Sequence, residues 1–340
     1  MNNNLYFFKS QLFKLSTTMN IFTQLITNPA IISLFIGLFI GTASTFSLAA
    51  HFVELISTYL IFTIGFKGGA CLGVANACTA PLMLLTFIGI VIGFLQPFFN
   101  YIILRKTTEL DRQTAGVVAA QFGSISIVTF ITTLSFLHER MIVYDTFMSA
   151  IAGIMEIPAL LSGIIIIKHI IGKNSKQESI WNVIKAVITC KKINVIFIGF
   201  FIGVLVRSYP EGIIHQLVLT PFNAILVLFM IDIGIKIAKQ KNALRHFGPS
   251  LIAFGIYMPL LHGFLGVVIT SIMHLSLGTS LLFTLLLASA SYIAVPAIMR
   301  IQAKNAKEVI YLPLALGITL PFNILVGIPF FYYCILYLQS

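Results

Sequence analysis

Long apolar runs separated by short polar or charged stretches dominate the chain. About 20 consecutive apolar residues span a bilayer as an α-helix, and ten runs come near or exceed that length. The pattern therefore predicts an all-α polytopic membrane protein with ten transmembrane helices. The predicted spans are residues 30–50, 52–70, 81–103, 114–136, 146–168, 193–208, 216–238, 249–274, 279–299 and 311–338.

The two halves of the chain share short motifs in the same order, at offsets between 162 and 169 residues. The matched pairs are FIGLFIG (35–41) with FIGFFIG (197–203), TIGFK (63–67) with DIGIK (232–236), GFLQP (93–97) with GIYMP (255–259), SIS (124–126) with SAS (289–291), and EIP (156–158) with TLP (319–321). Because five is an odd number, a unit of five spans enters the membrane from opposite sides in its two consecutive copies. The order of the motifs thus predicts two inverted five-helix repeats, the plan of many secondary transporters; chance matches in a generic helical bundle are the alternative.

The repeat divides the chain into four parts. Residues 21–168 form the first five-helix repeat and residues 192–340 the second, with a short basic linker at 169–191. Residues 1–20 are expected to be an N-terminal extension, and Met19 could be the true start. No small-residue cleavage site follows the first apolar stretch, so a cleaved signal peptide is not expected.

Positive charge is distributed unevenly between the loops. The formal net charge is +11, yet charged residues make up only 9% of the chain, far below a soluble domain. If the spans alternate, 16 of the 21 Lys and Arg residues fall on one side. The positive-inside rule makes that side cytoplasmic and places both termini outside. The basic charge is therefore explained by membrane topology, and no nucleic-acid partner is expected.

Spans 4 and 9 carry small hydroxyl residues at matching depths, in FGSISIVTF (122–130) and ASASYIAVPA (288–297). Pro296 also removes an amide donor from its helix. We expect both helices to be broken there, which would turn free N–H groups and positive helix ends toward a bound anion. The hydroxyls able to add neutral hydrogen bonds are Ser124, Ser126, Ser289 and Ser291. Close helix packing through small residues is the alternative interpretation.

Two carboxylates lie well inside predicted spans, Glu156 and Asp232. An ionisable group at that depth is a functional candidate. Glu156 and its repeat counterpart Thr319 each lie two residues before a proline, an arrangement that suits a coupling ion, either sodium or a proton on Glu156. A structural, hydrogen-bonded carboxyl is the alternative. Asp232 is followed by Lys236 on the same helix face, so an internal ion pair explains both residues.

Enzyme signatures are missing from the sequence. An intramembrane aspartyl protease needs two facing aspartates, a rhomboid-type protease needs a Ser–His pair with a GxSG-like turn, and zinc hydrolases carry clusters such as HExxH. None of these patterns occurs. We therefore expect no enzymatic activity and no cofactor. Composition alone also fits a channel, but inverted repeats with broken helices favour alternating access.

Several of these motifs together resemble the sodium-dependent bicarbonate permease family of carbon-concentrating bacteria. The resemblance extends from about residue 20 to the end of the chain. It rests on TIGFKGG (63–69), GSIS and TTL (123–126 and 132–134), YDTF leading to MEIPALL (144–161), PLLHG (259–263), ASASYIAVPAIMR (288–300) and ITLPFNILVGIPFF (318–331).

The resemblance implies a sodium-coupled bicarbonate symporter of the bacterial inner membrane, assembled as a homotrimer, in which a core domain moves against a gate domain. It also implies that both broken helices bind the anion and sodium, and that Glu156 lies near the ion site with Thr319. The substrate-binding positions it implies are Gly123, Ser124, Ser126, Ser289, Ser291 and Tyr292.

The chain departs from the family at three positions. Tyr292 stands where the family has an aspartate, Glu156 replaces another aspartate, and Leu320 replaces a threonine. The loss of one carboxylate leaves open another small anion, proton coupling, or a membrane protein of this fold that does not transport. The family's linker helps to bind a PII-like regulatory protein; here the short basic linker fits such a partner or a solvated face that obeys the positive-inside rule.

Overall fold

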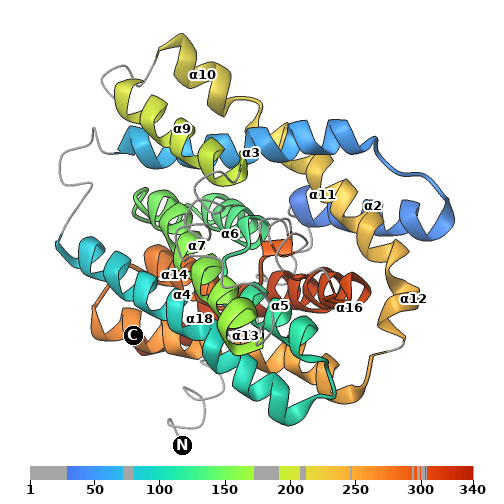
Figure 1. The fold of residues 1–340 in the computed structure, drawn as a ribbon. Helices are drawn as coiled ribbons and strands as arrows, with labels where there is room; N and C mark the ends of the chain where they lie inside the picture. Colours follow the sequence, from blue (N-terminus) through green and yellow to red (C-terminus); the bar gives the residue numbers. More distant parts are fainter. Residues whose placement is uncertain are drawn as a thin grey trace, which may run out of the picture.

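A computed structural model describes residues 29–71, 80–171, 191–206, 212–245, 247–292, 295–296, 299, 303 and 305–339. Over these ranges the chain is a bundle of helices without β-strands (Figure 1). The N-terminal extension 1–20 and almost all of the linker 169–191 lie outside the described residues. The domain boundaries drawn there stay predictions.

Each of the ten predicted spans overlaps a helix in the structure. Among the described residues, six helical stretches are long and apolar enough to cross a membrane. They comprise α3 (Ala50–Cys71), α4 (Ala80–Thr107), α7 (Met148–Ile165) continued by η1 (Ile166–Ile171), α10 (Ile213–Leu219) with α11 (Phe222–Lys239), α13 (Pro249–Ile272), and the last stretch from α16 to α18. The protein is therefore a multi-pass helical membrane protein.

The other four predicted spans correspond to shorter helices. These helices are α2 (Pro29–Ala43), α5 (Arg112–Gln121) followed by α6 (Ile127–Glu139), α9 (Lys191–Val206), and α14 (Leu277–Leu287). The last stretch of the chain is subdivided into α16 (Glu308–Pro313), η2 (Leu314–Thr319), α17 (Leu320–Phe322), η3 (Asn323–Gly327) and α18 (Ile328–Gln339). η1, η2 and η3 are π-helical turns, which occur frequently at functional sites.

The first span is shorter than predicted, because α2 ends at Ala43 and residues 44–49 are not helical. The Ser44 hydroxyl donates a hydrogen bond to the Ile40 carbonyl at 2.8 Å and accepts one from the Phe46 amide at 3.3 Å. Side-chain hydrogen bonds of this kind compete with the helix ladder. The prediction of a continuous helix over 30–50 was wrong at this end.

Helices α2, α3, α9 and α11 form a group of their own, called here the four-helix group. α2 packs mainly on α11, and α3 packs mainly on α9. In Figure 1 these helices lie together across the upper part of the molecule. The remaining spans pack below them: α4 on α5 and α7, α13 on α14 and η2, and α14 on α6 and α18.

Glycines bring the backbones of the four-helix group into close contact. Gly37 of α2 faces the Ile231 carbonyl of α11, and Gly199 of α9 faces the Phe62 carbonyl of α3. A Cβ atom at either glycine would overlap that carbonyl oxygen. Small residues permit this approach between membrane helices, so the two FIG motifs of the sequence are helix-packing elements.

Candidate functional site

Span 4 is broken between Gln121 and Ile127. α5 ends at Gln121, and α6 begins at Ile127 after five residues without helical structure. Ser126 is the N-cap of α6, and its hydroxyl accepts a hydrogen bond from the Thr129 amide at 3.2 Å. The cap satisfies one of the free N–H groups of the first turn. The break lies within residues 122–130, where the sequence predicts it.

Helix α14 ends at Leu287, and residues 288–292 are again not helical. Amide side chains from neighbouring spans satisfy the last carbonyls of α14. Gln96 Nε2 donates to the Leu287 carbonyl at 3.4 Å, and Asn323 Nδ2 donates to the Ala288 carbonyl at 2.9 Å. Beyond the break, the Val295 amide lies 3.4 Å from the Ser291 hydroxyl and donates to it.

The two breaks, residues 122–126 and 288–292, are hydrogen-bonded to each other. The Ser126 amide donates to the Ser289 hydroxyl at 2.8 Å, and the Ser291 amide donates to the Gln121 carbonyl at 2.9 Å. Segments about 165 residues apart in sequence therefore meet in the buried interior. All four predicted serines are buried there.

The four serine hydroxyls have different roles. The Ser289 hydroxyl also donates to the Leu286 carbonyl at 2.9 Å. The Ser126 hydroxyl caps α6, and the Ser291 hydroxyl accepts from the Val295 amide. The Ser124 hydroxyl is buried without a hydrogen-bond partner. A buried hydroxyl of this kind costs free energy unless something bound there satisfies it. Among the four serines, Ser124 is therefore the one whose hydroxyl is left for a ligand.

Glycines also bring α4 and α7 to the first break. Gly123 packs on the ring of Pro97 in α4, where an added Cβ would overlap the ring. A Cβ on Gly93 would lie 3.4 Å from the Met155 carbonyl of α7 and 3.9 Å from that of Gly123. Glu156 follows Met155 directly and is buried. The structure therefore places the helix that carries Glu156 against the α4 segment that also supports the break.

Thr319, the other residue predicted at the ion site, lies in the last helical stretch of the chain. It is the last residue of η2, is buried, and donates its hydroxyl to the Gly255 carbonyl of α13 at 2.9 Å. Because the proton is used in this bond, the oxygen lone pairs of Thr319 remain able to accept or to coordinate. Leu320, next to it, is buried and offers no side-chain oxygen.

Tyr292 is buried at the end of the second break, and its hydroxyl has no hydrogen-bond partner. Lys236 Nζ lies 2.6 Å from Asp232 Oδ2, which confirms the ion pair expected from the sequence. The ion pair therefore has its buried carboxylate on α11, within the four-helix group.

Removing either partner of this ion pair is expected to have unequal effects on stability. The Lys236 side chain is 45% exposed and can be solvated alone, whereas the Asp232 side chain is 4% exposed. Lys236→Met strands a buried charge and should lower the melting temperature more than Asp232→Asn, which leaves only an exposed ammonium. Thermal unfolding of the purified variants in detergent measures the difference; equal losses would contradict it.

The sequence interpretation missed several buried polar groups near the breaks. Atoms of Asn100, Gln121, Thr129 and Asn323 are buried without hydrogen-bond partners. Each is a polar residue within a predicted apolar span, and Gln121 stands directly before the first break. The position of Gln121 beside the break was the sequence signal that could have identified it.

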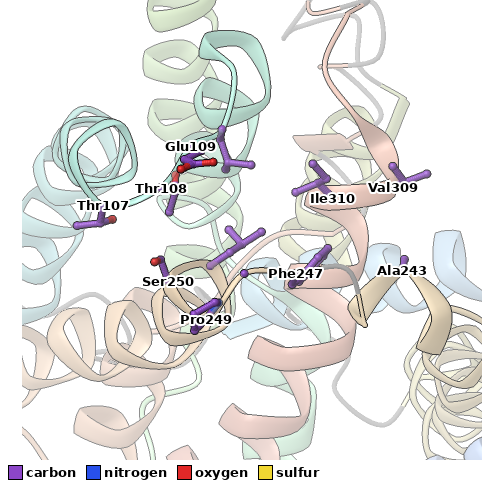
Figure 2. A pocket seen from close by; sticks show the side chains of 12 residues that line it. Thr107, Thr108, Glu109, Ala243, Phe247, Pro249, Ser250, Val309 and Ile310 are labelled. Atoms are coloured by element: carbon purple, nitrogen blue, oxygen red, sulfur yellow. The ribbon is translucent and has the colours of Figure 1, made fainter.

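Two cavities lie at opposite ends of span 4, and the second of them borders the four-helix group. The first, of about 830 Å³, is bounded by the loop before α5, by α12 (Lys241–Leu244) with the start of α13, and by α16. Figure 2 shows Glu109, Phe247 and Ile310 lining it from these three places. The second, of about 270 Å³, is bounded by the end of α6 and by α2, α3 and α11, with Lys67 among its lining residues.

Comparison with known proteins identifies a family for the chain, but no individual relative. In a comparison with curated proteins, no protein matched this chain. A family model described as the Na+-dependent bicarbonate transporter superfamily matches residues 29–336, almost the whole described structure. The match confirms the resemblance carried by the sequence motifs. The chain belongs to the Na+-dependent bicarbonate transporter superfamily.

Proposed function

We propose that the protein is a secondary active transporter that carries bicarbonate together with sodium across the bacterial inner membrane. The observation that carries the proposal is the hydrogen-bonded contact of the two breaks, through Ser126 with Ser289 and Ser291 with Gln121. The first-turn amides of α6 lack helical acceptors, and its positive dipole end favours an anion. The surrounding serines add neutral hydrogen bonds, which suit a small monoanion.

The proposal includes two inverted five-helix repeats. Contacts that recur at the repeat offset support it. The Lys307 amide donates to the Thr114 hydroxyl at 2.9 Å, and the Asp145 amide donates to the Thr279 hydroxyl at 2.9 Å. Thr114 begins span 4 and Thr279 begins span 9, so matching loops close over matching helix starts. The paired glycine contacts of α2 with α11 and of α9 with α3 follow the same relation.

The proposal also assigns the four-helix group as the gate and the remaining spans as the core. Two observations favour this division. The glycine contacts make the four-helix group tightly packed within itself, and the second cavity lies where α2, α3 and α11 border the end of α6. Sliding of the core along this border would open the breaks first to one cavity and then to the other, which is alternating access.

Glu156 and Thr319 are proposed to hold the coupling sodium ion. Glu156→Gln is expected to raise the sodium concentration for half-maximal uptake by about tenfold, because a carboxylate is a stronger partner for a cation than an amide. The matched control is Glu109→Gln, at an exposed residue of the first cavity. Sodium titration of uptake is the measurement, and an unchanged half-saturation in Glu156→Gln would contradict the assignment.

Uptake of labelled bicarbonate into proteoliposomes tests the function directly. It should be measured with and without an inward sodium gradient, at a pH high enough to limit leakage of carbon dioxide. Uptake driven by the sodium gradient supports the symporter. Absence of flux with correctly inserted protein contradicts it and favours a member of the family that does not transport.

Tyr292 favours a second candidate function. In it, the protein transports another small monoanion or couples transport to protons instead of sodium. In the resembled family an aspartate stands there, and the buried Tyr292 hydroxyl supplies no negative charge for sodium. A proton gradient and a panel of small anions in the same proteoliposomes separate this candidate from bicarbonate–sodium symport.

A further inference from the structure

Gln121 has an unusual environment for a buried amide. It is the last residue of α5, is 0% exposed, and its main-chain carbonyl accepts the hydrogen bond from Ser291. Its side-chain Nε2 and Oε1 are both buried without a hydrogen-bond partner. An amide with both groups unpaired loses the hydrogen bonds it would make in water.

The other buried amides in the described part of the chain donate to the protein. Gln96 donates to Leu287, Asn100 to Ala119, and Asn323 to Ala288. These three side chains tie helices together. Gln121 does not, so its hydrogen-bonding capacity, one donor group and one acceptor, is available to a bound molecule.

Two unpaired hydroxyls follow Gln121 along the chain. Ser124 in the break and Thr129 in the first turn of α6 each have a buried hydroxyl oxygen without a partner. The N-terminus of the 13-residue helix α6 lies between them. The helix end favours negative charge, and none of these three side chains carries a formal charge. The expected occupant is therefore a small anion that needs both donors and an acceptor.

We propose that Gln121 makes the transporter selective for a small oxyanion that carries a hydroxyl group. In this arrangement Nε2–H donates to an oxygen of the anion, and Oε1 accepts the proton of its hydroxyl. The inference deepens the proposed function, on which it rests. Bicarbonate has such a hydroxyl, whereas nitrate has the same charge and planar shape but only acceptors. Nitrate would leave Oε1 unpaired against an oxygen, and sites built to bind a hydroxyl reject analogues that lack it.

Competition in proteoliposomes tests the selectivity. In the wild type, unlabelled nitrate should inhibit labelled bicarbonate uptake at a concentration about tenfold or more above that of unlabelled bicarbonate. Gln121→Met keeps a side chain of similar length but removes both polar groups, and should reduce this ratio to near one. Gln96→Met is the matched control: the same change at a buried amide that donates to the protein should keep the wild-type ratio.

Three results would overturn the inference. One is an unchanged nitrate-to-bicarbonate ratio in folded Gln121→Met. Another is a sodium half-saturation that Gln121→Met shifts by a larger factor than the nitrate-to-bicarbonate ratio, which would make Oε1 a cation ligand. The third needs no variant: equal thermal stabilisation of the wild type by bicarbonate and nitrate. If the wild type shows no bicarbonate flux but is stabilised more by bicarbonate than by nitrate, the proposed function fails and the selectivity stands.

Discussion

Ser124→Leu is expected to abolish bicarbonate uptake while the protein still inserts in the membrane. Ser124 is 1% exposed, and its hydroxyl is the one serine hydroxyl of the two breaks left without a protein partner. Leucine removes that hydrogen-bonding group and fills the space beside the start of α6 with apolar atoms. Because displacement of a bound reactant by about 1 Å can cost 100-fold, we expect uptake to fall by at least about that factor.

The matched control is Ser44→Leu, the same change in the exposed segment after α2. It should leave uptake near the wild-type level. Ser291→Leu should repeat the loss, because it removes the buried hydroxyl that accepts from the Val295 amide and adds apolar bulk to the second break. Uptake is measured in proteoliposomes with equal amounts of inserted protein. Normal uptake by both Ser124→Leu and Ser291→Leu would remove the breaks from the site.

Gly37→Ala and Gly199→Ala are each expected to destabilise the protein strongly, although each adds only one methyl group. The new Cβ would overlap the carbonyl oxygen of Ile231 or Phe62, and a main-chain atom within a helix cannot move aside by a rotamer change. The helices must separate, which we expect to cost at least the roughly 1–3 kcal/mol of core overpacking.

Gly248→Ala provides the control, since a Cβ on Gly248 meets nothing within 4 Å. Melting temperatures of the three variants in detergent give the comparison. The two helix variants should lose stability by similar amounts, because each new Cβ would meet a helix carbonyl oxygen at a similar distance, and Gly248→Ala should melt near the wild type. Melting of all three at the wild-type temperature would show that α2 and α9 are not tightly packed.

Local chemistry explains why the helix breaks could be predicted from the sequence. Hydroxyl residues, a glycine and a proline in an apolar span act on the backbone within a few residues, as Ser126 does when it caps α6. The end of α2 depends on equally local bonds of Ser44, but the sequence interpretation gave more weight to the apolar run around it. Both effects are local, and the first span was predicted too long because the apolar run was weighted above the hydrogen-bonding serine.

The roles of individual site residues depend on contacts between distant segments and could not be predicted. The four serines were assigned one common role, yet Ser289 receives the Ser126 amide whereas Ser124 receives none. Which hydroxyl is used depends on how two broken helices about 165 residues apart are aligned. Gln121 was overlooked for the same reason, since its main-chain contact with Ser291 becomes visible only in three dimensions.

The pairing inside the four-helix group has a consequence for biosynthesis. α2 is made early, but its main packing partner α11 ends at Lys239, so about two thirds of the chain must be synthesised before they can meet. Until then Gly37 has no Ile231 carbonyl to pack against. Contacts so distant in sequence form slowly and leave intermediates exposed. Nascent chains truncated before α11 should therefore be the forms that membrane quality-control proteases remove.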